Sequence, residues 1–354
     1  MKKPALIVSD VHFHNWDAFS TTLKDGRNSR LQIQLNEFVL AAHVLRSKHE
    51  GNLIIGAGDW FHTRGRLQPS VLNPVVEMHQ TLIREGFEIV LIAGNHDLEG
   101  KSADDLGSAI TALREVGCQV INAPTKMPGR YSLIPWIENL DELKTAIQQI
   151  QKLSAEPEKQ TLIIHAPVNG VIKGLNGLDA AWLNDLKFGR VYAGHYHFHK
   201  ALTDKVISIG ALTHQTWGDV GSTAGFIIDH GPDKPFQHYV TQAPRFVRID
   251  DLSKFKSDTD LQIAISNHYV RVDLPIEKDK DVRDLRTRLT KLGALGVIVN
   301  PIRENRVTRT SSAAKPGASL RETVDEYLKL RSDYSPELES LCGKILTKAM
   351  EISE

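Results

Sequence analysis

The chain has 354 residues, 41% of them hydrophobic, and its 43 lysines and arginines balance its 43 aspartates and glutamates. The length predicts two or three domains. The zero net charge gives no support to a strongly basic nucleic-acid binder, although basic residues gathered on one face of the protein would still allow nucleic-acid binding. No apolar run is long enough to span a bilayer and no signal-peptide segment begins the chain, so we expect a cytoplasmic protein without membrane contact. Two distant cysteines, Cys118 and Cys342, are expected to be free thiols.

Strands and helices alternate over the first 120 residues. Short apolar runs rich in β-branched residues predict strands, and apolar residues at helical spacing predict helices. The strands are expected at 4–9, 53–55 and 88–93, and the helices at 31–48, 70–85 and 107–116. This alternation is typical of a sheet that is covered by helices.

A second set of short strands follows Cys118. They are expected at 131–136, 161–164, 190–194, 206–209 and 226–228, with helices near 143–150 and around Trp182. The pattern predicts an α/β protein in which two stacked sheets lie between helices, with the strand ends gathered at one edge.

The pattern changes again near residue 246. Alternating apolar and polar residues and a charged helix at 281–292 predict a small α+β unit, followed by a linker rich in Ser, Thr, Ala and Gly. Two short helices follow, and the second begins with Ser335 as N-cap and Pro336 at N1. The expected parts are a main domain at 1–245, a small domain at 246–307, a linker at 308–318 and a helical segment at 319–354.

Polar side chains with metal-binding chemistry follow the predicted strands. These residues are Asp10, His12, Asp59, His62, Asn95, His96, His165, His195 and His197. Carboxylates, imidazoles and a carboxamide suit divalent ions such as manganese, zinc or iron, and nine such residues are too many for one ion. Two ions bridged by a carboxylate form a known device for hydrolysing phosphate esters, and Asp59 is the natural bridge. Extended backbone would point Asp10 and His12 to the same side, and likewise His195 and His197.

A single histidine at a strand end is weak evidence for a metal site. We interpret His14, His43, His79 and His214 as ordinary surface or core histidines. Five such segments in order, each following an apolar strand, favour a dinuclear site.

The five segments resemble the motifs of the calcineurin-like metallophosphoesterases. They are Asp10-X-His12, Gly58-Asp59, Gly94-Asn95-His96-Asp97, His165 and Gly194-His195-X-His197. The resemblance covers about the first 230 residues and implies a four-layer α/β/β/α sandwich. Within that superfamily, Gly58 to His62 and Ile134-Pro135-Trp136 are similar to segments of the SbcD-type DNA double-strand-break nucleases and their phage relatives. The small unit is similar to that family's capping domain.

The resemblance also implies roles for the site residues. One metal would be held by Asp10, His12, Asp59 and His197, and the other by Asp59, Asn95, His165 and His195. His96 would be the catalytic histidine, Asp97 could orient it, and His62 would be a second histidine facing the phosphate. The ions are expected to be Mn²⁺, with Mg²⁺, Zn²⁺ or Fe²⁺ as alternatives.

The leading functional hypothesis is a DNA nuclease subunit in DNA repair, recombination or phage DNA metabolism. By resemblance its C-terminal helices would dock on a coiled-coil SbcC-type ATPase, and the helix at 70–85 is a candidate homodimer surface. Basic residues of the small domain could track phosphates, namely Arg283, Arg286, Arg303 and Arg306. The alternatives are a phosphomonoesterase or cyclic-nucleotide phosphodiesterase, and an inactive metal-binding scaffold.

Overall fold

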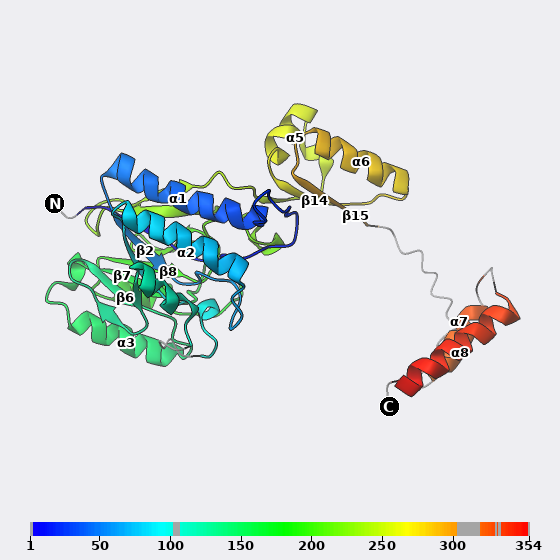
Figure 1. The fold of residues 1–354 in the computed structure, drawn as a ribbon, viewed down its shortest axis with the longest axis horizontal. Helices are drawn as coiled ribbons and strands as arrows, with labels where there is room; N and C mark the ends of the chain where they lie inside the picture. The colour runs from blue at the N-terminus through cyan, green and yellow to red at the C-terminus, as the bar shows by residue number, and fades with distance from the viewer. Residues whose placement is uncertain (1–2, 102–106, 303–318, 330, 332–333, 353–354) are drawn as a thin grey trace. The chain divides into compact units, whose positions relative to one another are not determined.

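The computed structural model describes residues 3–101, 107–302, 319–329, 331 and 334–352. The chain divides into two compact units, Met1–Pro301 and Ile302–Glu354. Within the first unit, Figure 1 shows helices α1 and α2 over one side of the stacked sheets and helix α3 over the other side. None of the described helices combines the length and the apolar character needed to cross a membrane.

Two six-stranded sheets form the main domain of the described chain. The first runs in the order β12 (Gln237–Val240), β11 (Gly225–Asp229), β1 (Ala5–Val8), β2 (Leu53–Ala57), β3 (Glu88–Ile92) and β4 (Gln119–Ile121). The second runs in the order β5 (Thr125–Lys126), β6 (Tyr131–Ile134), β7 (Thr161–His165), β8 (Arg190–Gly194), β10 (Val206–Ser208) and β9 (Lys200–Ala201). Strands β1 to β4 are parallel neighbours, as are β6, β7, β8 and β10.

Three apolar clusters show that the sheets stack between helices. Successive residues of one strand face opposite sides, so Leu6 packs towards α1 (Ser29–His49) and α2 (Pro69–Arg84), whereas Ile7 packs between the sheets. On the far side, α3 (Leu140–Lys152) and α4 (Ala180–Asp185) cover the second sheet. The predicted α/β/β/α sandwich is therefore confirmed.

Capping residues define both ends of helix α1. The Asn28 side chain caps the start of α1 by accepting hydrogen bonds from the backbone of Arg30 and Leu31 at 2.9 and 3.1 Å. The C-cap residue of α1, Glu50, has a left-handed backbone conformation.

The helix predicted at 107–116 is a 3₁₀ helix at Ala109–Val116. Its tighter winding leaves only Ile110 and Leu113 buried, three residues apart on one face.

A smaller sheet lies within the range 246–307 that we predict to be a small unit, and its described strands belong to the same compact unit as the main domain. Its parallel strands are β13 (Phe246–Ile249), β14 (Tyr269–Leu274) and β15 (Gly296–Pro301), and two helices cover one face, α5 (Asp258–Ile265) and α6 (Asp279–Lys291). The sequence prediction missed α5. On the uncovered face, the rings of Phe246 and Tyr269 contact the Arg30 guanidinium of α1 with centroids 5.2 and 5.5 Å away. This contact joins the small sheet to the main domain.

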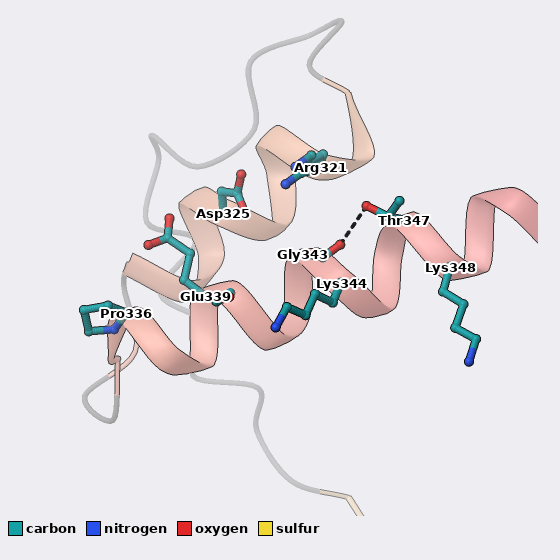
Figure 2. A pocket seen from close by; sticks show the side chains of 9 residues that line it. Arg321, Asp325, Pro336, Glu339, Gly343, Lys344, Thr347 and Lys348 are labelled. Carbon is teal, nitrogen blue, oxygen red and sulfur yellow. Dashed lines mark hydrogen bonds between the residues drawn. The ribbon is translucent and has the colours of Figure 1, made fainter.

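The second unit is a pair of helices, α7 (Leu320–Lys329) and α8 (Pro336–Ile352). The predicted cap of α8 is confirmed, because the Ser335 hydroxyl accepts a hydrogen bond from the Leu338 backbone at 3.2 Å. Figure 2 shows a mostly polar groove between the helices, with Arg321 and Asp325 on α7 and Lys344 on α8. The groove has a volume of about 720 Å³. Residues 303–318, which include the predicted linker, lie outside the described residues.

Candidate metal centre

All the predicted metal ligands come together at one edge of the two sheets. Asp10 and His12 follow β1, Asp59 follows β2 and Asn95 follows β3 of the first sheet; His165 ends β7, and His195 and His197 follow β8 of the second sheet. Since these strands run parallel within each sheet, their carboxyl ends meet at the same edge. The hydrogen bond from the His195 backbone to Asp10 Oδ2, 3.0 Å long, joins the two sheets there.

The backbone at these strand ends is not extended, so the alternation expected of a strand does not place these side chains. Asp10 and His12 still share one ligand group as predicted, whereas His195 and His197 fall in different groups. Asp10, His12 and Asp59 have φ values of 51°, 49° and 53°, and His195 has a φ of 112°. These positive values are unusual for residues with side chains and are typically held in place by surrounding contacts at functional sites. Here the Asp10 and His12 backbones donate hydrogen bonds to the carbonyls of Gly58 and Asp59 at 3.1 and 3.0 Å.

Glycines before the ligands allow these loops to approach closely. A Cβ on Gly94 would lie 2.2 Å from both the backbone nitrogen and Oδ1 of Asp59. A Cβ on Gly58 would lie 2.1 Å from Nδ1 of His165. A larger residue at Gly58 or Gly94 would therefore clash with a ligand of a neighbouring motif, which explains the glycine in both motifs.

The ligand atoms fall into compact groups that agree with the predicted pairs of metal sites. Asp10, His12 and His197 form one group, and Asp59, His165 and His195 form another, each with its ligand atoms within 4.8 Å of one another. Asp59 Oδ2 lies between them, 3.5 Å from His12 Nε2 and 3.4 Å from His165 Nε2. This is where a bridging carboxylate oxygen would lie.

Asn95 belongs to the second group through its carbonyl oxygen. Asn95 Oδ1 lies 3.0 Å from His195 Nδ1 and 3.3 Å from His165 Nε2. The other nitrogen of the His165 ring, Nδ1, donates to the Ala57 carbonyl at 2.8 Å. That bond fixes the ring so that Nε2 faces Asp59 and Asn95, which is the position of a metal-binding nitrogen.

A buried carboxylate oxygen at the centre supports binding of a cation. Asp10 is fully buried, and among the described residues nothing donates a hydrogen bond to its Oδ1. Burial raises the pKa of Asp10, because the charged form loses its hydration there. A divalent ion at Oδ1 would compensate this charge, so the donor set fits the metals that the motifs imply.

Burial and the neighbouring carboxylates shift the pKa values of the four ligand histidines in opposite directions, and the neutral imidazole is the form that binds metal. Burial lowers the pKa of His195 to about 4 and also lowers that of His12. His165 and His197 differ. Burial lowers the pKa of His165, but Asp59, Asp10 and the Ala57 carbonyl together raise it to about 9. Burial likewise lowers the pKa of His197, but its hydrogen bond to Asp219 and the nearby aspartates raise it. Burial of Asp59 favours its neutral form, yet His165, His12 and His96 together hold its pKa below the usual range.

A third group of histidines flanks the first metal group. His62 Nδ1 lies 3.4 Å from His12 Nδ1, and the His62 and His96 rings are stacked with centroids 5.2 Å apart. His96 Nδ1 donates to the His62 carbonyl at 2.7 Å, so this carbonyl orients the catalytic candidate. His14, which we interpreted as an ordinary histidine, is half-buried with its ring centroid 5.0 Å from that of His62.

Asp97 anchors the loops rather than the His96 ring. Its carboxylate accepts hydrogen bonds from the backbones of Trp60, Phe61 and Gly94 at 2.9–3.2 Å. Burial, with some repulsion from Asp59, raises the pKa of Asp97 to about 7. Asp97 therefore joins the loop after β2 to the loop after β3, and its effect on His96 acts through the backbone.

Sequence reasoning missed Asp219. Its Oδ1 accepts a hydrogen bond of 2.6 Å from His197 Nδ1, and its Oδ2 accepts from the backbones of Gln215 and Thr216 at 2.7 and 2.8 Å. Gln215 in turn donates to the Asp10 carbonyl at 2.7 Å. No motif spacing relates these residues to the strand ends, so the sequence carried no signal for them.

The predicted DNA-contacting residues are only partly described. Arg283 and Arg286 are exposed on α6, which covers the face of the small sheet opposite to the one that contacts Arg30. Arg303 and Arg306 lie outside the described residues. DNA contact by these four arginines stays a prediction.

Comparisons with known proteins show the family of the chain and two proteins to which it is similar. The family model described as calcineurin-like phosphoesterase matches residues 3–199, more than half of the chain. Among curated proteins, the chain is 25% identical over 294 residues to "Exonuclease subunit 1" of Enterobacteria phage T4, covering 78% of this chain and 80% of that protein. Among solved structures, it is similar to Pseudomonas putida nuclease MPE, at 19% identity and a TM-score of 0.28, over 64% of this chain and 70% of that one.

Proposed function

This chain belongs to the calcineurin-like phosphoesterase family, and from that premise we propose that it is a two-metal-dependent phosphodiesterase that cleaves DNA. The observation that carries the proposal is the convergence of two ligand groups on the shared carboxylate of Asp59. The phage relative named as an exonuclease subunit supports a nucleic acid as the substrate, and the resemblance to the SbcD-type nucleases favours DNA.

The first ion would be held by Asp10, His12, Asp59 and His197, and the second by Asp59, Asn95, His165 and His195. Nitrogen and oxygen donors without sulfur suit Mn²⁺, with Mg²⁺, Zn²⁺ or Fe²⁺ as alternatives. When bound, such ions polarise the phosphoryl oxygens and lower the pKa of water towards neutrality.

The chain's own residues would orient the phosphate and move a proton. With its Nδ1 fixed on the His62 carbonyl, His96 can carry a proton on Nε2 and pass it to the leaving oxygen. Burial lowers the pKa of His62 to about 4, so its neutral ring would contact the phosphate without adding charge. Asp97 holds both loops and thereby positions His96 and Asp59.

The C-terminal helices support a partner-binding role for the second unit. Tyr327, Leu341 and Ile345 are 60, 55 and 59% exposed, which is more apolar exposure than a short helix pair needs. We propose that they dock on a coiled-coil ATPase, consistent with the word subunit in the name of the phage relative.

The function is tested with purified protein, Mn²⁺ and three substrates: linear duplex DNA, single-stranded DNA and p-nitrophenyl phosphates. We expect DNA degradation that is lost in His96→Ala while the bound metal content is unchanged. His43→Ala is the matched control, because His43 is an exposed histidine of α1 that contacts Glu85. Hydrolysis of small esters with intact DNA would instead indicate a phosphomonoesterase or cyclic-nucleotide phosphodiesterase. Inactivity on every substrate, with and without an ATPase partner, would indicate a scaffold.

A further inference from the structure

Trp136 lies between the candidate metal centre and a groove beside it. Its backbone N–H donates to the Ala93 carbonyl at 2.8 Å, which holds it next to the loop after β3. The half-buried indole stacks on the His195 ring, with centroids 5.2 Å apart and an angle of 24° between the planes. It also lies 6.1 Å from the His165 ring. The same side chain lines a groove of about 590 Å³.

The groove suits a flat, uncharged ring better than a phosphate. Apolar side chains that line it include Pro124, Pro135 and Ile137. Its charged residues are Lys101, Glu138 and Glu142, and the lysine is paired with Glu138 at 2.8 Å. This leaves a net negative charge, which repels a phosphodiester but can accept hydrogen bonds from the amino and imino groups of a base.

We propose that Trp136 and this groove form a subsite for one nucleobase of the strand whose phosphodiester lies at the metal centre. The proposal rests on the proposed DNA-cleaving function. A base that stacks on the indole would leave its sugar and phosphate beside His195, because the indole and the His195 ring are in contact. A base enters the groove only after it leaves its stack and its partner, so the substrate class is single-stranded DNA or a strand end that has unpaired.

The test uses a series of single-stranded oligonucleotides of about 20 nucleotides, each with one abasic site at a different position. The cleavage rate is measured at each bond of every oligonucleotide. In the unmodified protein we expect one abasic position, next to the cleaved bond, to slow cleavage about tenfold, as the loss of one base–aromatic stack predicts. Trp136→Ala should cleave intact and abasic strands at equal rates, and Trp136→Tyr should keep most of the discrimination. The ratio of the two rates is the readout, so a change in overall activity from the lost contact with His195 cancels. Trp182→Ala, which changes a partly buried tryptophan of α4, should keep the full ratio.

A position-specific abasic effect that persists unchanged in Trp136→Ala would overturn the subsite, as would its absence in the unmodified protein. If the protein cleaves no DNA, the proposed function fails, and a binding measurement then decides on the subsite separately. A single strand that contains 2-aminopurine loses fluorescence when this base stacks on an aromatic ring. Quenching by the unmodified protein that disappears in Trp136→Ala would support the subsite, and equal fluorescence with both proteins would overturn it.

Discussion

A substitution of Asp219 gives the most specific test of how the chain orients the predicted metal ligand His197. In the unmodified protein, Asp219 Oδ2 accepts hydrogen bonds from the Gln215 and Thr216 backbones. In the variant Asp219→Asn, the amide oxygen must take this position so that both backbone N–H groups keep an acceptor. The amide NH₂ group would then face His197 Nδ1, which itself donates to Asp219 at 2.6 Å. Two donors cannot pair, so His197 is driven to the tautomer protonated at Nε2 and loses the lone pair that would bind metal.

Loss of such an outer carboxylate typically weakens metal affinity or activity by about 10- to 100-fold, or about 1.4–2.7 kcal/mol. We expect Asp219→Asn to show this loss in Mn²⁺ titration calorimetry and in kcat/KM on DNA. Asp204→Asn is the matched control, because Asp204 is exposed in the loop before β10. The reasoning would be refuted by an Asp219→Asn protein that binds Mn²⁺ and turns over within twofold of the unmodified protein.

Three further predictions follow from packing, burial and charge. Gly94→Ala should lower the rate of DNA cleavage more than tenfold, because the new Cβ would lie 2.2 Å from the Asp59 backbone nitrogen. Gly100→Ala is the control: its Cβ would meet nothing within 4 Å, so the cleavage rate should stay unchanged. Burial lowers the pKa of His79 from 6.5 to about 4, so His79 stabilises the fold above pH 6.5 and this contribution is lost as pH falls towards 4. Urea unfolding should therefore show about 2 kcal/mol less stability at pH 5 than at pH 7 from this residue, a difference that His79→Phe should remove; an unchanged pH dependence in the variant would contradict it. Removal of metal by EDTA should abolish DNA cleavage and lower the Tm, and Mn²⁺ should restore both; a Tm that is unaffected by Mn²⁺ would contradict the fit of the donor set.

Local sequence was sufficient to predict the strands that carry the site. Buried parallel strands are apolar along their whole length, so β2, β3 and β7 stand out as short β-branched runs that end in polar residues. Helix α5 was missed because it has only eight residues and buries only Leu261 and Ile265, four residues apart. A single apolar pair gives too little periodicity to distinguish a helix from a loop.

The ligand groups could be predicted because each strand end contributes its own motif, but the contacts around them could not. Asp219 reaches His197 through a 3₁₀ turn, Trp217–Asp219, that the Thr216 side chain caps by accepting from the Gly218 backbone at 3.2 Å. Trp136 follows β6 and reaches His195, which follows β8, past the strand β7 that lies between them in the second sheet. Both contacts join segments that are distant in sequence, so they depend on the completed fold and leave no local pattern.

Three buried carboxylates of the site, Asp97, Asp59 and Asp10, differ in how their charge is compensated, and this difference links folding to metal binding. Asp97 accepts three backbone N–H groups, and Asp59 accepts the His96 backbone at 2.8 Å and lies beside His12 and His165. Asp10 receives the His195 backbone at Oδ2 only, and its Oδ1 faces the ring nitrogen of His12 at 4.0 Å. A buried carboxylate without a close partner destabilises the fold, and a divalent ion at Oδ1 would remove that penalty. Ion binding should therefore stabilise the folded chain most strongly through Asp10, the ligand that the protein leaves least satisfied.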